Sequence, residues 1–228
     1  MWAFPLAASA VALAFAILLA RQFLLRRRSY QALWALAMAM FAAASLAVFL
    51  GVLRNWSTGD FRVFWLFGAV LNVPYLACGE LHLLLRRGAV RTALVLILLF
   101  GTAFAVSRVV SAHVAAAPLH GNLPSGKDVF AHDSFALTLA RLYSFPAYGL
   151  LVAGTAWSAW RMRGRSELRD RFVGTLLIAV GATVVAGGSA FAAAGNATGF
   201  SLTLAAGVAL MFWGFLRASR RSGVPRTG

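Results

Sequence analysis

The sequence predicts an all-α polytopic integral membrane protein in which residues 1–228 form one seven-transmembrane-helix bundle. Composition is the first reason, because 61% of the 228 residues are hydrophobic and only 12% are charged, which is unlike a water-soluble domain. The second reason is a series of seven long apolar runs. The third is the placement of arginines, which gather at every second connection between these runs.

Each apolar run is long enough to cross a bilayer. A hydrocarbon core of about 30 Å requires about 20 apolar residues in helical conformation. The runs contain 18 to 26 residues and are continuous, without the alternation of polarity that strands show. In chain order they are Trp2–Ala20, Ala32–Leu53, Val63–Leu85, Thr92–Ser111, Phe135–Trp160, Phe172–Ala194 and Gly199–Leu216.

The first run is expected to be a retained span with its N-terminal side outside. No positive charge precedes it and several arginines follow it, which is the reverse of a cleaved signal peptide. The connections after the first, third, fifth and seventh runs hold 16 of the 21 basic residues. The positive-inside rule therefore predicts an outer N-terminus and a cytoplasmic C-terminus.

Glycines recur at heptad spacing in the last two runs. Gly174, Gly181 and Gly188 lie seven residues apart in the sixth run, and Gly207 and Gly214 do so in the seventh. Such a stripe of small residues lets two helices approach closely. We expect this stripe to be an internal seam between the two runs, with an oligomer contact as the alternative.

The third run has the most polar character. Glu80 lies six residues before Arg86, or about 9 Å inside the inner boundary at 1.5 Å per residue. An intramembrane carboxyl is costly, so it should face the bundle, water or a partner. Pro74 predicts a kink beside this stretch. The candidate ligand-binding or proton-relay residues are Asn72, Tyr75, Glu80 and His82; the alternative is interhelical hydrogen bonding with a contact between Glu80 and an arginine.

Two arginines at the outer ends of adjacent runs form a second candidate site. Arg108 and Arg141 lie at one predicted depth, with Ser111 and Tyr143 nearby. They could clamp an anionic group such as a carboxylate or phosphate. The alternative is that both side chains extend to the outer surface and anchor their helices there.

The longest outer connection, Ala116–Asp133, carries a third candidate site. Imidazole and carboxylate ligands suit zinc or copper, although the spacing matches no metal motif. The candidate metal ligands in and beside this loop are His113, His120, His132 and Asp133. The alternative is a solvated loop that covers the bundle.

Single residues of the sequence argue against several cofactors. A retinal Schiff base requires a lysine in the last run, whereas Lys127 is the only lysine and lies in a loop. Haem held by two histidines would need a second intramembrane histidine opposite His82. Cys78 is the only cysteine, so a cysteine-based zinc site is excluded. The cofactor therefore stays unknown from the sequence.

The charge pattern indicates the partners. The net charge of +15 is dispersed in short clusters beside the runs, which suits anionic lipid headgroups at the inner arginines and argues against nucleic acid. A homo-oligomer and a membrane or cytoplasmic partner protein are further possibilities. Twenty arginines against one lysine suggest a GC-rich bacterial genome, and hence a multi-pass protein of a bacterial cytoplasmic membrane.

Three functions compete at this point. The first is a sensor-like or accessory module that binds a small or lipid-like molecule and has no catalytic domain of its own. The second is a transporter of small solutes, or a proton-coupled one, that uses Glu80. The third is a metal-handling protein or enzyme that uses the outer histidines. We favour the first, because the polar residues gather toward the outer side.

Overall fold

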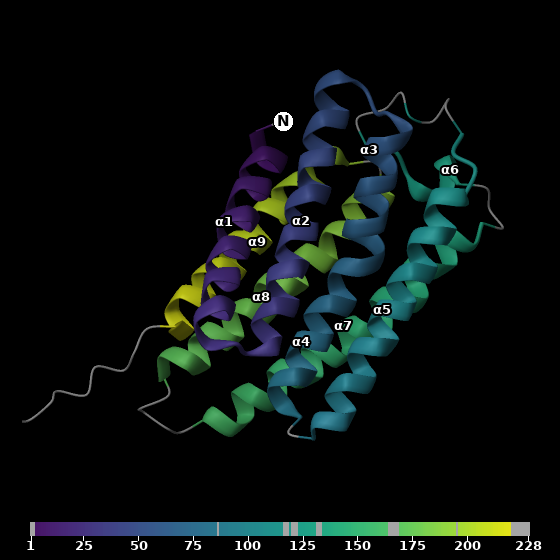
Figure 1. Ribbon diagram of the computed structural model, residues 1–228. Coiled ribbons are helices and arrows are strands. Elements are labelled where there is room, and N and C mark those ends of the chain that lie inside the picture. The colour runs from purple at the N-terminus through teal and green to yellow at the C-terminus, as the bar shows by residue number, and fades with distance from the viewer. Residues whose placement is uncertain are drawn as a thin grey trace, which may run out of the picture.

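A computed structural model describes residues 3–85, 87–115, 119, 123–130, 134–163, 169–194 and 196–219, and these residues form helices and no strand (Figure 1). Seven helices among the described residues are long and apolar enough to cross a membrane, which is the number of long apolar helices that the sequence predicts. The third of these helices contains a π-helical stretch, and the fifth contains a proline in its interior. The bounds are α1 Ala3–Arg26, α2 Ser29–Arg54, α3 Thr58–Val63, η1 Phe64–Leu71, α4 Asn72–Leu84, α5 Gly88–Ser111, α6 Gly126–Val129, α7 Phe135–Met162, α8 Arg169–Ala193 and α9 Ala197–Ser219.

The third long helix, Thr58–Leu84, is built from α3, η1 and α4 and begins earlier than the apolar run predicts. A capping box sets this start: the Asp60 amide donates to Ser57 Oγ over 3.0 Å, and the Ser57 amide donates to Asp60 Oδ2 over 3.3 Å. Likewise α5 begins at Gly88 and not at Thr92. Hydropathy marks the apolar part of a helix, whereas capping and backbone geometry decide where the helix starts.

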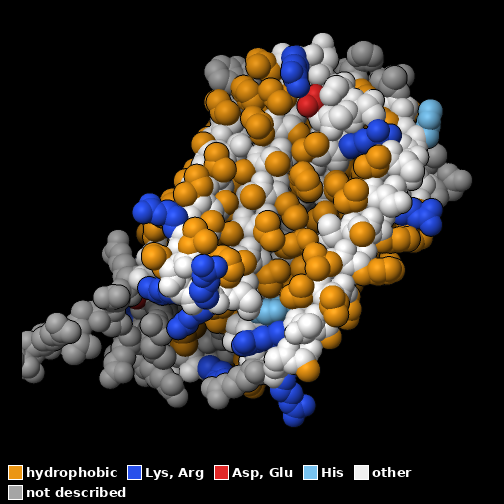
Figure 2. Space-filling view, in the orientation of Figure 1, with side chains coloured by type: hydrophobic (Ala, Val, Ile, Leu, Met, Phe, Trp, Pro, Cys, Tyr) orange, Lys and Arg blue, Asp and Glu red, His pale blue; other side chains and the backbone are white. Residues whose placement is uncertain are grey.

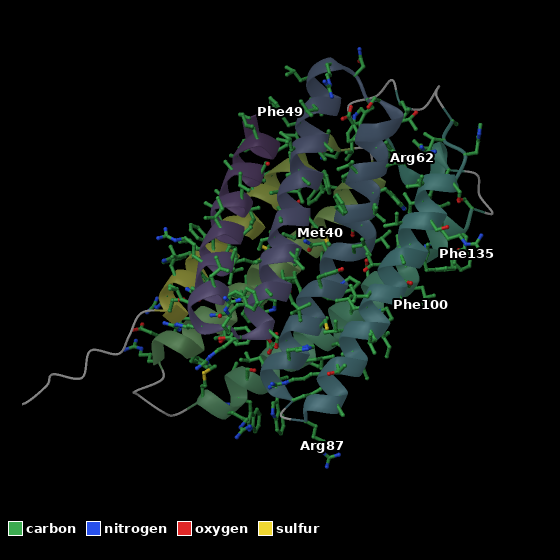
Figure 3. All side chains as sticks on the ribbon, viewed as in Figure 1. Met40, Phe49, Arg62, Arg87, Phe100 and Phe135 are labelled. Atoms are coloured by element: carbon green, nitrogen blue, oxygen red, sulfur yellow. The ribbon has the colours of Figure 1, made fainter. Side chains whose placement is uncertain are left out.

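The bundle has two chemically different ends. At one end lie the start of α1 and the short helix α6, and we call this the α6 end (Figure 1). At the opposite end α1 finishes and α2 begins, and its described arginines include Arg26, Arg87 and Arg163; we call it the arginine-rich end. Figure 2 shows a broad apolar surface between the two ends, with Lys and Arg side chains mostly toward the second. In Figure 3, Arg87 extends beyond that end and Phe100 points outward from α5.

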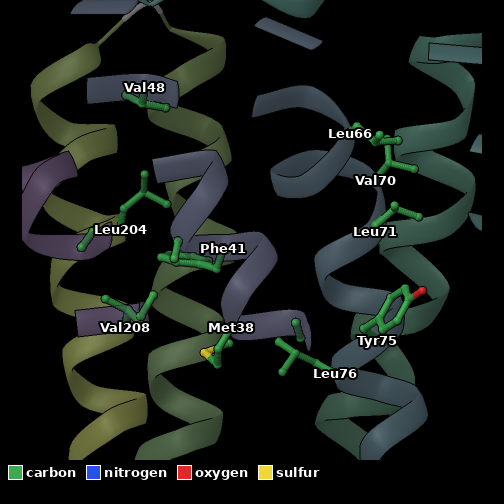
Figure 4. Close-up of a cluster of buried hydrophobic side chains, with 14 of the residues drawn as sticks. Met38, Phe41, Val48, Leu66, Val70, Leu71, Tyr75, Leu76, Leu204 and Val208 are labelled. Atoms are coloured by element: carbon green, nitrogen blue, oxygen red, sulfur yellow. The ribbon is translucent and has the colours of Figure 1, made fainter. Parts of the chain in front are cut away.

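The core lies where α1, α2, α4 and α9 meet. Figure 4 shows part of it, with Met38 and Phe41 of α2 beside Leu204 and Val208 of α9. By contrast, α5 keeps large apolar side chains exposed, among them Phe100 at 77%. A helix with this exposure is suited to face lipid.

The glycine stripe forms an internal seam between α8 and α9, as the sequence predicts. A Cβ atom at Gly181 would lie 2.5 Å from the carbonyl oxygen of Gly207. A Cβ atom at Gly174 would lie 2.5 Å from the carbonyl oxygen of Gly214. Only glycine permits so close an approach of two helix backbones.

A π-helix, η1, lies directly before α4, the helix that contains Pro74. Pro74 cannot donate a backbone hydrogen bond, and wide turns of this kind are often found where the helical ladder is interrupted. Within η1, the carbonyl of Ala69 accepts a hydrogen bond from another helix. Its donor is Ser144 Oγ of α7, at 2.5 Å.

The short helix α6 packs onto the third long helix at the α6 end. A Cβ atom at Gly126 would overlap the indole ring of Trp65, so glycine is required at this contact. Backbone pairing between Val114 and Phe130 ties the segment after α6 to the end of α5. The Trp65 ring also lies 5.4 Å from that of Phe130. These contacts fix α6 above the helices that line the cavity described next.

Candidate functional site

A large cavity of about 450 Å³ lies inside the half of the bundle nearer the α6 end. Its volume falls within the range of about 300 to 1,000 Å³ that is typical of small-molecule sites. The walls are mainly apolar and come from α2, η1, α4, α6, α7, α8 and α9. Uncharged polar side chains interrupt them at Ser45, Asn72, Ser144, Tyr148 and Ser189.

The charged side chains that line the large cavity among the described residues are both cationic. Lys127 comes from α6, and Arg141 comes from the second turn of α7. Since both belong to the α6 end and no described acidic residue lines the cavity, this end favours an anionic group. From Arg141 the lining continues along α7 to Leu151, a distance of about 15 Å at 1.5 Å per residue.

The large cavity reaches the surface between α7 and α8. Its lining includes Phe145 of α7, which is 71% exposed, and the exposed Ser189 of α8. A hydrogen bond from Tyr148 to Thr183 Oγ1, 2.9 Å long, joins the same two helices further along. The cavity therefore has exposed lining residues on the lateral surface of the bundle.

A small cavity of about 70 Å³ contains Glu80. The Glu80 side chain is only 3% exposed, and its Oε1 accepts a hydrogen bond of 3.2 Å from Ser158 Oγ of α7. The hydroxyl-bearing side chains of Thr155 and Thr175 also line this cavity. Glu80 makes no ion pair with any described arginine, and Arg86 lies outside the described residues.

One apolar layer separates the two cavities. Four side chains line both of them and are nearly fully buried, one from each of α2, α4, α7 and α9. They are Met38, Leu76, Leu151 and Met211. Figure 4 shows Met38 and Leu76 side by side between their helices. The cavities are therefore stacked along the bundle with a wall one side chain thick.

The four polar residues predicted as one site on the third run are all buried but do not gather. Asn72 lines the large cavity and donates to the Ala37 carbonyl over 2.7 Å. Glu80 lines the small cavity, whereas Tyr75 and His82 line neither. The Tyr75 hydroxyl pairs with Thr102 of α5 at 3.2 Å, and His82 Nδ1 donates to the carbonyl of Cys78 at 2.9 Å. The helix turns these groups toward different neighbours.

The two arginines predicted as an anion clamp are also separated in their contacts. Arg141 lines the large cavity, but Arg108 does not. The guanidinium of Arg108 lies 5.2 Å from the centre of the Phe104 ring and 5.7 Å from that of Phe135.

The other two residues predicted for the clamp, Ser111 and Tyr143, donate hydrogen bonds to backbone carbonyls of α5. Ser111 Oγ donates to the carbonyl of Ser107 over 2.7 Å. Tyr143 donates to the carbonyl of Gly101 over 3.2 Å. Of the two predicted arginines, Arg141 lines the large cavity, which Lys127 of α6 also lines.

The predicted metal site falls largely outside the described residues. His120, His132 and Asp133 lie there, and His113 is exposed at the end of α5. Within the described ranges, no three His, Cys, Asp or Glu side chains gather in a way that could hold a metal ion.

Sequence reasoning missed Ser158, Tyr148 and Lys127 as cavity residues. Ser158 and Tyr148 are two of several polar residues in α7, and the signal that could have found them is that an intramembrane polar group needs a partner. Lys127 was assigned to a solvated loop because the packing of α6 on Trp65 is a tertiary contact that the local sequence does not reveal.

Searches against models of protein families, curated proteins and solved structures found no match to this chain.

Proposed function

We propose that this protein is a membrane-embedded binding module for an anionic amphipathic molecule, such as a lipid-like carboxylate or phosphate. One observation carries the proposal: a cavity of about 450 Å³ has mainly apolar walls, and the charged residues that line it, within the described part of the chain, are Lys127 and Arg141. The anionic group binds at these cations, and the apolar part extends along α7 toward the layer of four side chains. Entry from the bilayer takes place between α7 and α8.

We also propose that the α6 end faces the outside of a bacterial cytoplasmic membrane. Support comes from the excess of arginines at the opposite end, since positive charge favours the cytoplasmic side. The ligand would then come from the outer leaflet or the outer solution. The test is labelling in intact cells with a membrane-impermeant thiol reagent, in a Cys78→Ser background that carries Lys127→Cys or Arg163→Cys. Labelling at position 163 instead of 127 would show that the orientation is the opposite of the one proposed.

The binding proposal is tested with a fluorescent long-chain fatty acid and the purified protein in nanodiscs. We expect saturable binding, and we expect Arg141→Gln to weaken it about tenfold, because a hydrogen bond to a charged group contributes roughly 1.5 to 3 kcal/mol. The matched control is Arg108→Gln, which removes an arginine at the same end that lies outside the cavity lining.

A competition series checks the charge requirement. The unlabelled fatty acid should displace the probe at much lower concentration than the corresponding fatty alcohol, which has the same chain without the charge. Equal loss of binding in Arg141→Gln and Arg108→Gln, or equal displacement by acid and alcohol, would contradict the proposed site.

A further inference from the structure

The small cavity contains a buried carboxyl group, that of Glu80, which ligand binding in the large cavity does not explain. Glu80 lies within a helix that can cross the membrane, is 3% exposed, and receives one hydrogen bond, from Ser158. An ionised carboxylate in such a place is costly unless a positive charge or a proton neutralises it. No described cationic side chain does so.

Among the described residues that line the small cavity, Glu80 is the titratable one. Apolar side chains come from α1, α2 and α9, and hydroxyl groups come from α7 and α8. On α4 itself the nearest titratable neighbours are Cys78 and His82, and the imidazole Nδ1 is occupied with the Cys78 carbonyl. A proton is therefore the simplest neutralising species that these residues can accommodate.

The small cavity also has room for water. Its volume of about 70 Å³ exceeds the roughly 10 to 15 Å³ that one buried water molecule requires. Glu80, Ser158, Thr155 and Thr175 offer oxygen atoms to hydrate it. Water at this site can carry a proton to and from the carboxyl group.

The residues around the small cavity indicate from which end of the bundle protons reach Glu80. On the α6 side the small cavity is closed by the apolar layer of Met38, Leu76, Leu151 and Met211. On the other side Glu80 is four residues from the end of α4, and the half-exposed Leu83 lines the cavity. We propose that Glu80 is a reversible proton-binding site in a hydrated chamber that exchanges protons with the arginine-rich end and is separated from the large cavity by this layer.

The test is labelling with dicyclohexylcarbodiimide, an apolar reagent that reacts with protonated carboxyl groups in membranes. The full chain in nanodiscs is treated over a series of pH values and analysed by intact and peptide mass spectrometry. We expect one adduct, at Glu80, whose yield falls as pH rises, and no adduct in Glu80→Gln. Ser158→Ala should extend labelling to higher pH, since the Ser158 hydroxyl donates its hydrogen bond to the carboxylate.

Two further measurements separate the alternatives. Infrared difference spectra should show a protonated carboxyl band that Glu80→Gln removes. This measurement needs no reagent, so it tests the proposal even if dicyclohexylcarbodiimide does not reach Glu80. Absence of both the adduct and the band at low pH would overturn the proposal. So would labelling that does not depend on pH, or protection by Na⁺ but not by choline at fixed pH, which would assign a metal cation to the site. None of these outcomes depends on ligand binding in the large cavity.

Discussion

The α8 and α9 seam offers the sharpest test of the fold, through the substitution Gly181→Ala. A Cβ atom at this position would lie 2.5 Å from the Gly207 carbonyl oxygen and 2.7 Å from Met211 Cγ. The first of these neighbours is backbone, so it can move away only if the two helices separate. Gly187 on the same helix has no atom within 4 Å of a built Cβ, and Gly187→Ala is therefore the matched control.

The expected magnitude follows from these distances. Close carbon to oxygen contacts in proteins are about 3.3 to 3.6 Å, so the helices must separate by about 1 Å. A gap of about 0.5 to 1 Å removes a quarter to a half of the dispersion attraction of the atoms along it. Overpacking of this kind typically costs about 1 to 3 kcal/mol, which corresponds to a roughly 5- to 150-fold change in the unfolding equilibrium.

The assay is unfolding of the purified protein in mixed micelles by added SDS, followed by far-ultraviolet circular dichroism. Gly181→Ala should unfold at a clearly lower SDS fraction than the wild type. Gly187→Ala should match the wild type or exceed it slightly, because alanine favours helix over glycine. If Gly181→Ala unfolds together with Gly187→Ala, the two helices do not pack through this glycine, and the seam as described is wrong.

Two smaller effects can be measured by related means. Asp60→Ala removes the carboxylate half of the capping box with Ser57, together with the ion pair to Arg54, and should cost about 1 kcal/mol in the same SDS titration. Its control, Asp170→Ala, removes only an exposed ion pair with Arg217 and should change stability by at most a few tenths of a kcal/mol. Ser144→Ala removes the donor from α7 to η1 and should speed amide hydrogen exchange in Phe64–Leu71; unchanged exchange would show that this hydrogen bond does not hold the π-helix in place.

Much of the architecture follows from the sequence because a bilayer imposes few solutions. The apolar runs predicted the seven long helices, since every backbone polar group in the hydrocarbon must be bonded within its own helix. The heptad glycines predicted the seam because only Gly181 and its counterparts let two backbones meet. These are local patterns, and they need no knowledge of the neighbouring helix.

The arrangement of polar side chains could not be predicted in the same way. Asn72, Tyr75 and His82 all lie on the regular helix α4, yet their hydrogen-bond partners lie on α2, on α5 and on α4 itself. The pairing of Glu80 with Ser158 depends on the rotation of α7 against α4. Helix rotation in a membrane is decided by packing against neighbours, which a single sequence with no marked polar face does not specify.

The large cavity has a physical origin in the composition of α8. Its glycine face is committed to α9, where backbones touch and no room for side chains remains. Toward α7 it presents small side chains, including Ala182, Ala186 and Ser189, and these are too short to fill the space between the helices. Large side chains close that space only at the level of Leu151 and Met211. The small residues of α8 therefore account for both the tight seam with α9 and the cavity beside α7, and the apolar layer is the level at which bulky neighbours restore contact across the bundle.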